Sequence, residues 1–161
     1  KESEPLALED ICAYVAELLP ADRDIVIGPG STCLAIKAAL GIQGTLRGVD
    51  VVSHTGRVAL DVTAEDMENL PAPFVIVRFT RGQGFLFGRG NQQLSARFLA
   101  RLAWPDDVLI VGSRTKLNTL QHRPLLLDTG DAALDERLSG LVSLVSGYED
   151  RLLYRLASVA Q

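Results

Sequence analysis

Hydrophobic positions along the chain switch repeatedly between helical and strand spacing. Apolar residues recur every three or four positions over residues 6–19, which predicts an amphipathic helix that Pro20 ends. A short apolar run predicts a strand over residues 24–27, and the turn Gly28-Pro29-Gly30 leads into a second helix over residues 31–40. The chain is therefore expected to begin as a helix, a strand and a helix.

The same alternation continues to the end of the sequence. Thr63 and Asp66 stand at the spacing of a weak capping box at a helix start. The last two strands are joined through Gly147 and could pair as an antiparallel hairpin at the edge of the sheet. Further strands are predicted over residues 45–52, 74–79, 107–111, 124–127, 141–145 and 151–156, and further helices over 63–70, 115–120, 131–138 and from residue 95 onward.

Strands that alternate with helices over short connections predict an α/β fold. We expect a mostly parallel sheet with helices on both faces. The sequence contains no internal repeat, low-complexity tract or linker, and its 161 residues suit one domain. Residues 1–161 are therefore expected to form a single α/β domain.

Composition supports a packed domain with an aliphatic core. Hydrophobic residues make up 47% of the chain and charged residues 22%, which excludes a disordered chain. Aromatic residues make up only 6%, so the core must consist mainly of Leu, Val, Ile and Ala. That bias is typical of strands buried on both faces.

Charge and hydropathy narrow the classes of partner. The net charge is -4, and no stretch combines Lys and Arg with aromatic residues, so nucleic-acid binding is not expected. No apolar run approaches the roughly 20 residues of a membrane span, and no signal sequence opens the chain. Cys12 and Cys33 lack metal-site spacing and are expected to be buried thiols in a reducing cytoplasm. We expect a cytoplasmic protein without a metal site in this segment; a homo-oligomer stays open.

The first candidate for ligand binding is a glycine turn between a strand and a helix. Gly28 and Gly30 let the backbone approach a ligand closely. Ser31 and Thr32 add hydroxyl groups at a helix start, where free N–H groups favour an anion such as phosphate. Pro29 removes one N–H group from the loop. The alternative is an ordinary tight turn in which Ser31 caps the helix.

The second candidate is a glycine-rich passage that also carries several amides. Arg89 lies between Gly88 and Gly90, and Asn91 and Gln92 follow directly. A guanidinium group can bind two oxygens of a phosphate or carboxylate at once, and amides can orient a planar ligand. The alternative is a mobile glycine loop whose amides cap the neighbouring backbone.

Acidic residues supply the third candidate. Asp128 and Asp131, on either side of Thr129, could hold a cation or accept hydrogen bonds from ribose hydroxyl groups. The alternative is that Asp131 only begins a helix. Asp50, at a strand end, could also face a ligand crevice. Because all these turns follow strands, we expect them to meet at one edge of a parallel sheet.

No nucleophile motif accompanies these turns. Neither His54 nor His122 lies near a Ser or Cys in a recognisable nucleophile turn, so the catalytic residues stay unknown. Trp104 and Tyr148 are interpreted as packing residues.

Four segments of the chain resemble motifs in the C-terminal part of the ATP-NAD kinase family, which includes proteins associated with acetoin catabolism. The most specific is the run Gly-Arg-Gly-Asn-Gln-Gln, and the resemblance extends over residues 24–156. The segments are residues 28–32, 48–52, 84–93 and 128–131.

This resemblance implies the C-terminal domain of a longer kinase-like protein. Such a domain would contribute nucleotide or phosphate binding to the phosphorylation of NAD or a related hydroxyl substrate, with ATP or polyphosphate and Mg²⁺ serving the whole protein. The family's Gly-Gly-Asp-Gly-Thr motif belongs to its N-terminal domain and does not occur in this sequence. The catalytic residues are therefore expected upstream of Lys1, and this segment alone is expected to be inactive.

Two other functions stay open. The chain could be a non-catalytic or regulatory module for a phosphorylated metabolite, because the turn over residues 28–32 also resembles the phosphate loop of sugar-phosphate isomerases and related transcriptional regulators. It could also be an oligomerisation domain without a ligand. The absence of a general base in a fixed motif weakens autonomous catalysis, while the anion-friendly turns weaken a purely structural role.

Overall fold

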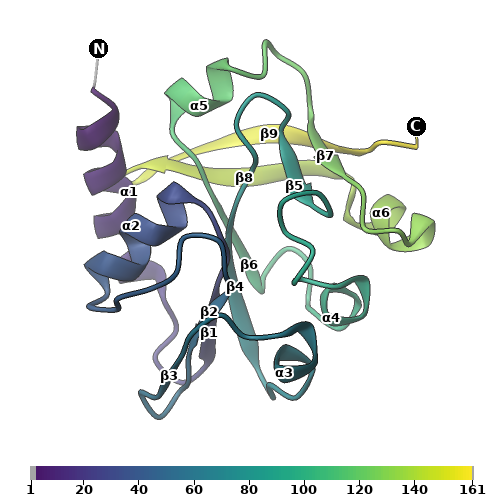
Figure 1. Cartoon of the computed structure of the whole chain (residues 1–161). Coiled ribbons are helices and arrows are strands. Elements are labelled where there is room, and N and C mark those ends of the chain that lie inside the picture. Colours follow the sequence, from purple (N-terminus) through teal and green to yellow (C-terminus); the bar gives the residue numbers. More distant parts are fainter. Residues whose placement is uncertain (1–2, 161) are drawn as a thin grey trace.

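The structure is a computed structural model that describes residues 3–160 (Figure 1). Helices and strands alternate along most of the chain, as the sequence predicts. The helices are α1 (Glu4–Leu18), α2 (Ser31–Ala39), α3 (Ala64–Glu68), α4 (Ala96–Ala100), α5 (Arg114–Asn118) and α6 (Ala132–Leu138). The strands are β1 (Asp24–Ile27), β2 (Asp50–Val52), β3 (Val58–Ala59), β4 (Pro73–Arg78), β5 (Phe85–Phe87), β6 (Val108–Val111), β7 (Leu125–Leu127), β8 (Gly140–Gly147) and β9 (Asp150–Ser158).

The strands form one sheet in the order β3-β2-β1-β4-β6-β8-β9-β7-β5. Five of the eight pairings between neighbours are parallel, namely β1–β4, β4–β6, β6–β8, β9–β7 and β7–β5. The predicted α/β fold with a mostly parallel sheet is therefore confirmed.

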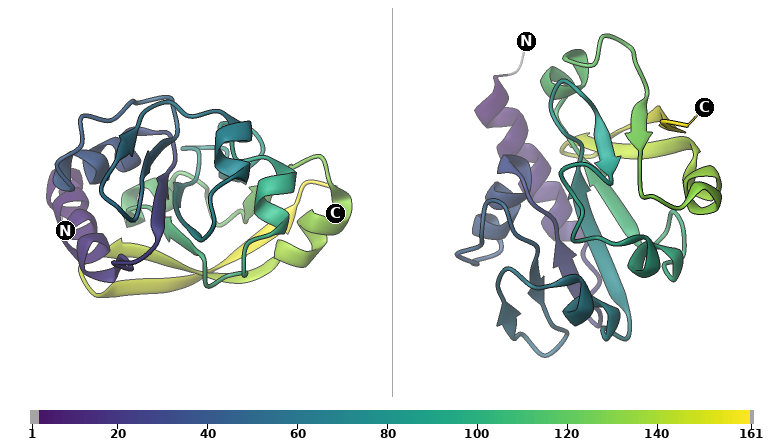
Figure 2. Two further views of the ribbon diagram at one scale, coloured as in Figure 1. Left: turned by 90° about the horizontal axis from the view of Figure 1, so that it is seen from below. Right: turned by 45° about the vertical axis from the view of Figure 1, so that its right-hand side comes forward.

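The sheet consists of two parallel blocks that run in opposite directions. Strands β1, β4, β6 and β8 point one way and β9, β7 and β5 the other, because β8 and β9 pair antiparallel between the blocks. The C-terminal hairpin is thus antiparallel as predicted, but its expected place at the sheet edge is wrong, since the edge strands are β3 and β5. With eight and nine residues, β8 and β9 are long enough to pair with each other and with one outer neighbour each. Figure 2 shows this long ribbon crossing the domain from α1 to α6.

Helices cover both faces of the sheet. Ile25 and Ile27 of β1 lie in a core with α1 and α2, whereas Val26 between them lies in a second core with α3, α4, α5 and α6. This separation follows from the alternation of side chains along a strand. No helix among the described residues is long and apolar enough to cross a membrane.

Local signals explain most element boundaries. The predicted capping box of α3 is present, with Thr63 and Asp66 each accepting from the other's backbone N–H group. Two strands were not predicted, the short exposed β3 and the buried β5 inside the glycine-rich passage. The strand predicted over residues 45–52 is shorter and begins only at Asp50, because residues 45–48 form a loop.

Candidate functional site

The first glycine turn connects β1 to α2 with an unusual backbone at Gly30. Gly30 is the N-cap of α2, with φ 108° and ψ 164°, a region that only glycine adopts readily. The expected alternative, Ser31 as N-cap, is therefore wrong; Ser31 is the first helical residue and is exposed. The N–H group of Gly30 donates to the carbonyl oxygen of Leu46 at 2.8 Å. A Cβ atom at Gly30 would lie 2.3 Å from Nε of Arg78, so this glycine makes room for an arginine.

Arg78 joins the first turn to the second. It ends β4 and is half-buried, and its Nη1 donates to Oδ1 of Asn91 at 3.1 Å. Asn91 is fully buried, and its amide nitrogen donates to the carbonyl oxygens of Leu86 and Arg78. A Cβ atom at Gly90 would lie 2.8 Å from a methyl carbon of Thr80. The two glycine turns are therefore adjacent, and Asn91 holds the second one in place.

Lys116 also lies at the first turn. Its Nζ lies 2.6 Å from Oγ1 of Thr32 and 3.3 Å from Oγ of Ser31. Burial lowers the pKa of Lys116, and the nearby cations Arg81 and Arg78 lower it further. Burial also lowers the pKa of Arg78. Sequence reasoning missed both residues, because the motifs that it used were glycine-rich and local.

A polar hollow lies on the other side of the second turn. Its volume is about 250 Å³, and its lining includes Gly88, Arg89, Gln92, Asp128 and Thr129. Nε of Arg89 lies 3.2 Å from the carboxylate of Asp128, and both groups are accessible. Gly88 is required here, because a Cβ atom would lie 2.1 Å from the carbonyl oxygen of Asp128. The sequence singled out all five residues independently, three of them in the second turn and two in the third.

The third turn, residues 128–131, mainly caps the N-terminus of α6. Asp131 is the N-cap of this helix and accepts from the N–H group of Leu134. The hydroxyl group of Thr129 donates to the buried carboxylate of Asp135 at 2.6 Å. The contacts of Asp131 thus fit the alternative interpretation, in which it begins a helix. Among residues 3–160, no group of three or more His, Cys, Asp or Glu side chains could hold a metal ion.

The turns come together for a reason other than the expected one. The first turn follows β1, whereas the second and third follow β5 and β7, which belong to the oppositely directed block. They therefore do not share one carboxyl edge of a uniformly parallel sheet. The second turn instead lies between the other two, with Asn91 against Arg78 and Gly88 against Asp128.

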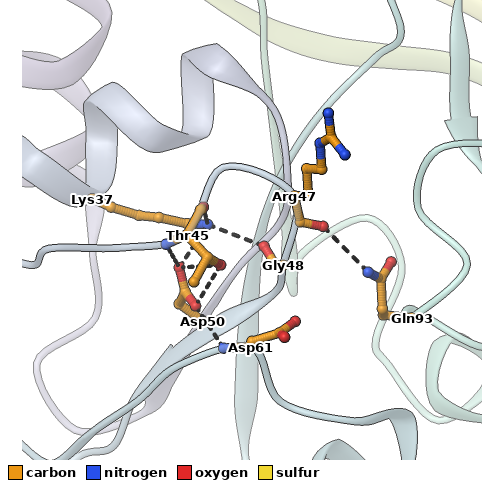
Figure 3. Close-up of polar contacts among 7 residues, drawn as sticks. All are labelled: Lys37, Thr45, Arg47, Gly48, Asp50, Asp61 and Gln93. Carbon is orange, nitrogen blue, oxygen red and sulfur yellow. Dashed lines mark hydrogen bonds and ion pairs between the residues drawn. The ribbon is translucent and has the colours of Figure 1, made fainter.

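Asp50 holds a loop rather than facing a crevice. Its carboxylate is fully buried and lies 2.8 Å from Nζ of Lys37, which is also fully buried (Figure 3). It accepts further hydrogen bonds from the N–H and hydroxyl groups of Thr45 and from the N–H group of Asp61. Burial alone would raise the pKa of Asp50, but these hydrogen bonds, led by that of Lys37, outweigh it and lower the pKa. The expectation that Asp50 contacts a ligand is therefore not supported by its contacts.

The loop that Asp50 holds contacts both glycine turns. Lys37 donates to the carbonyl oxygens of Thr45 and Gly48, which fixes the loop from within. The two carbonyl groups between them bond to the glycine turns. That of Leu46 accepts from the N–H group of Gly30. That of Arg47 accepts from Nε2 of Gln93 at 3.3 Å (Figure 3). The Lys37–Asp50 pair thus positions the site indirectly.

The remaining singled-out residues lie elsewhere. His54 bonds to the buried carboxylate of Asp24, at the amino end of β1. Burial would raise the pKa of Asp24, but the hydrogen bonds of His54 outweigh it and leave this pKa below its usual value. Cys33 is a fully buried free thiol whose pKa burial raises to about 11, and Cys12 is partly buried. Trp104 packs edge-on against Phe87, as a packing residue should.

Tyr148 differs from the expectation. Its side chain is exposed, and its hydroxyl group donates to Glu17 at 2.6 Å while its ring meets Tyr14 edge-on. It therefore fastens the outside of α1 to the end of β8 rather than filling a core.

Fold and site together define an α/β domain with cations and hydroxyl groups gathered at glycine turns. The family model described as the ATP-NAD kinase C-terminal domain matches residues 22–156, and the chain belongs to this family. The resemblance stated from the motifs is thereby confirmed. Comparison with curated proteins gave no match, and comparison with solved structures gave none either.

Proposed function

We propose that this domain binds a nucleotide for an enzyme that phosphorylates NAD or a related hydroxyl substrate. Membership of the ATP-NAD kinase C-terminal domain family supports the kinase context. The observation that carries the proposal is the hollow of about 250 Å³ beside Gly88, where Arg89 and Asp128 meet. A guanidinium group suits phosphate oxygens, and a carboxylate suits ribose hydroxyl groups.

Arg89 is oriented before any ligand arrives. Its guanidinium carbon lies 4.9 Å from the centroid of the Phe85 ring, and its Nε faces Asp128. The side chain remains two-thirds exposed, so a phosphate group could approach it without displacing the protein core. An exposed ion pair of this kind contributes only about 0–1 kcal/mol, so exchanging its partner is inexpensive.

In this proposal the two glycine turns bind different parts of the nucleotide. The first turn, with its hydroxyl groups, binds the outer phosphate oxygens, and the hollow binds the ribose through Asp128 and the neighbouring phosphate through Arg89. Asp50 and Asp131 hold the loops and Asn91 holds the second turn. The ligand-contacting set is Gly28, Gly30, Ser31, Thr32, Gly88, Arg89, Gly90, Gln92, Asp128 and Thr129.

ATP or polyphosphate and Mg²⁺ are proposed for the whole kinase rather than for this domain alone. A magnesium ion neutralises charge on the transferring phosphate. The hydroxyl groups and cations at the first turn fit phosphate oxygens, and the cations, Lys116 and Arg78, would repel Mg²⁺. We therefore propose the first turn as a phosphate site and not as a magnesium site.

Calorimetric titration of the chain with ATP, NAD and NADP tests this function. We expect Arg89→Ala to weaken binding about ten- to a hundredfold, since a hydrogen bond to a charged group contributes about 1.5–3 kcal/mol. Arg97→Ala is the matched control, because Arg97 is also an exposed arginine beside a carboxylate, 3.9 Å from Glu68. The proposal fails if the wild type binds none of the three nucleotides, or if Arg89→Ala binds them as tightly.

A non-catalytic module for a phosphorylated metabolite is the second candidate. The observation in its favour is the place of the two histidines, the usual proton carriers. His54 is bonded to Asp24, and His122 lines a different hollow with Arg114 and Tyr154. Binding of a sugar phosphate in the same titration, with no binding of the nucleotides, would favour this candidate.

A further inference from the structure

Two cations, Arg78 and Lys116, lie at the first glycine turn, and the exposed Arg81 lies near Lys116. Arg78 ends β4, Arg81 follows three residues later, and Lys116 reaches the turn from α5. Lys116 is close enough to Arg78 and Arg81 for both to lower its pKa. Three like charges in one place oppose folding unless an anion accompanies them.

No carboxylate lies within ion-pair distance of this cluster in the described part of the chain. Over residues 3–160, neither Arg78, Arg81 nor Lys116 forms an ion pair, although five other lysine and arginine side chains do. Arg78 and Lys116 are also half-buried, so water solvates them incompletely. Their hydrogen bonds go instead to the neutral side chains of Asn91, Thr32 and Ser31.

The surroundings of the cluster are already organised. The hydroxyl group of Thr32 is buried and lies 2.6 Å from Nζ of Lys116. The absence of a side chain at Gly30 leaves Arg78 beside the turn, and Asn91 orients its guanidinium group. Arg78 and Lys116 are therefore held in position before a ligand binds.

We propose that the Arg78–Arg81–Lys116 cluster binds a phosphate group, as inorganic phosphate or as the terminal phosphate of a nucleotide, against Ser31 and Thr32. The three cations neutralise the dianion, and the hydroxyl groups donate to its oxygens. The nine-residue helix α2 begins at the same place and adds a favourable dipole. The assignment deepens the proposed function, on which it rests for the identity of the rest of the ligand.

A change at Glu4 should strengthen phosphate binding, whereas a change at Lys116 should weaken it. It is the acidic residue that acts on Lys116, and its carboxylate oxygens accept from the hydroxyl group of Ser113 at 3.0 and 2.9 Å. Its negative charge opposes a phosphate beside Lys116. Glu4→Gln removes that charge and keeps an oxygen to accept from Ser113, so it should bind phosphate more tightly.

The experiment is titration of the 161-residue chain with inorganic phosphate, and then with ATP in the absence and presence of saturating phosphate. We expect Lys116→Gln to weaken phosphate binding tenfold or more and Glu4→Gln to tighten it measurably. Arg97→Gln, which removes one positive charge away from the cluster, should leave it unchanged. Thermal unfolding of each variant without phosphate monitors folding. Arg78→Lys serves as a second variant, which keeps the positive charge at the end of β4 but loses the guanidinium group.

The outcomes separate this inference from the proposed function. Phosphate binding that depends on Lys116, without binding of any nucleotide, supports the cluster and overturns the nucleotide function. Nucleotide binding that depends on Arg89, with no competition by phosphate and no effect of Lys116→Gln, overturns the cluster alone. If the wild type binds no phosphate and Lys116→Gln only lowers the unfolding temperature, Lys116 is a strut between α5 and α2 and the inference is wrong.

Discussion

Lys37 and Asp50 form an ion pair of 2.8 Å in which neither side chain is exposed to solvent. Each charge therefore depends on the other and on the hydrogen bonds of the loop around them. We expect Asp50→Asn to lower the free energy of unfolding by about 3–5 kcal/mol, because Lys37 remains as a buried charge without its partner. Urea denaturation measures this loss.

Two further variants sharpen the Lys37–Asp50 prediction. Asp61→Asn changes an exposed carboxylate of the same loop system and should alter stability by less than about 0.5 kcal/mol. The double variant Lys37→Met/Asp50→Leu should lose less unfolding free energy than the single variants Lys37→Met and Asp50→Leu lose in sum, because it leaves no isolated charge. A loss below about 1 kcal/mol for Asp50→Asn would contradict the importance of the pair.

Acid should remove the contribution of Asp50. Its pKa in the folded protein lies below the ordinary value of 3.8, mainly because Lys37 and two backbone N–H groups overcome the effect of burial. A carboxyl group with a lowered pKa stabilises the fold above its unfolded pKa, and this stabilisation is lost as the pH falls through the folded pKa. The stability difference between wild type and Asp50→Asn should therefore be complete at neutral pH and shrink below about pH 3.8. An unchanged difference in strong acid would show that another group is responsible.

Gly30 and Gly41 allow backbone strain to be separated from crowding of Arg78. Both have a positive φ, but a Cβ atom at Gly41 would meet nothing within 4 Å, whereas one at Gly30 would collide with Arg78. Each glycine-to-alanine change should cost about 1–3 kcal/mol for its backbone conformation. Only Gly30→Ala should also weaken phosphate binding, because it displaces the guanidinium group. Equal effects of both variants on phosphate affinity would argue against a role for Arg78.

The isolated chain should not convert NAD to NADP. Its sequence lacks the Gly-Gly-Asp-Gly-Thr motif that the kinase family uses, and both of its histidines lie away from the glycine turns. The assay supplies ATP, Mg²⁺ and NAD and measures NADP, with a mock purification as the control for contaminating kinases. Turnover above that control would place a complete active site in these 161 residues.

Local signals accounted for much of the fold. The spacing of Thr63 and Asp66 gave the capping box of α3, and apolar periodicity gave α1, β1, β4 and β6 within a few residues. Strand direction was less accessible, because no local pattern states that β8 and β9 insert between two blocks. Strand β5 was missed since Phe85, Leu86 and Phe87 form only a short apolar run among glycines, which suggests a loop.

The candidate site divides in the same way. The glycines and Arg89 could be proposed from the sequence because their backbone and side-chain properties are visible in adjacent residues. Lys116 stands 84 residues from Thr32, and on a five-residue helix it resembles any other surface lysine. The ion pair of Asp50 was not predicted, because the sequence shows a carboxylate at a strand end but not the lysine that the fold buries against it.

The central place of the β8–β9 ribbon has a consequence for synthesis of the protein. A ribosome releases β9 after every other strand of this chain, although β9 is the strand through which β7 and β5 join the rest of the sheet. Until then the nascent chain holds two groups of strands whose inner edges are unpaired, and such edges invite pairing with other chains. Completion of the sheet must wait for its final strand, so truncation near the C-terminus would separate the two halves of the domain rather than trim its margin.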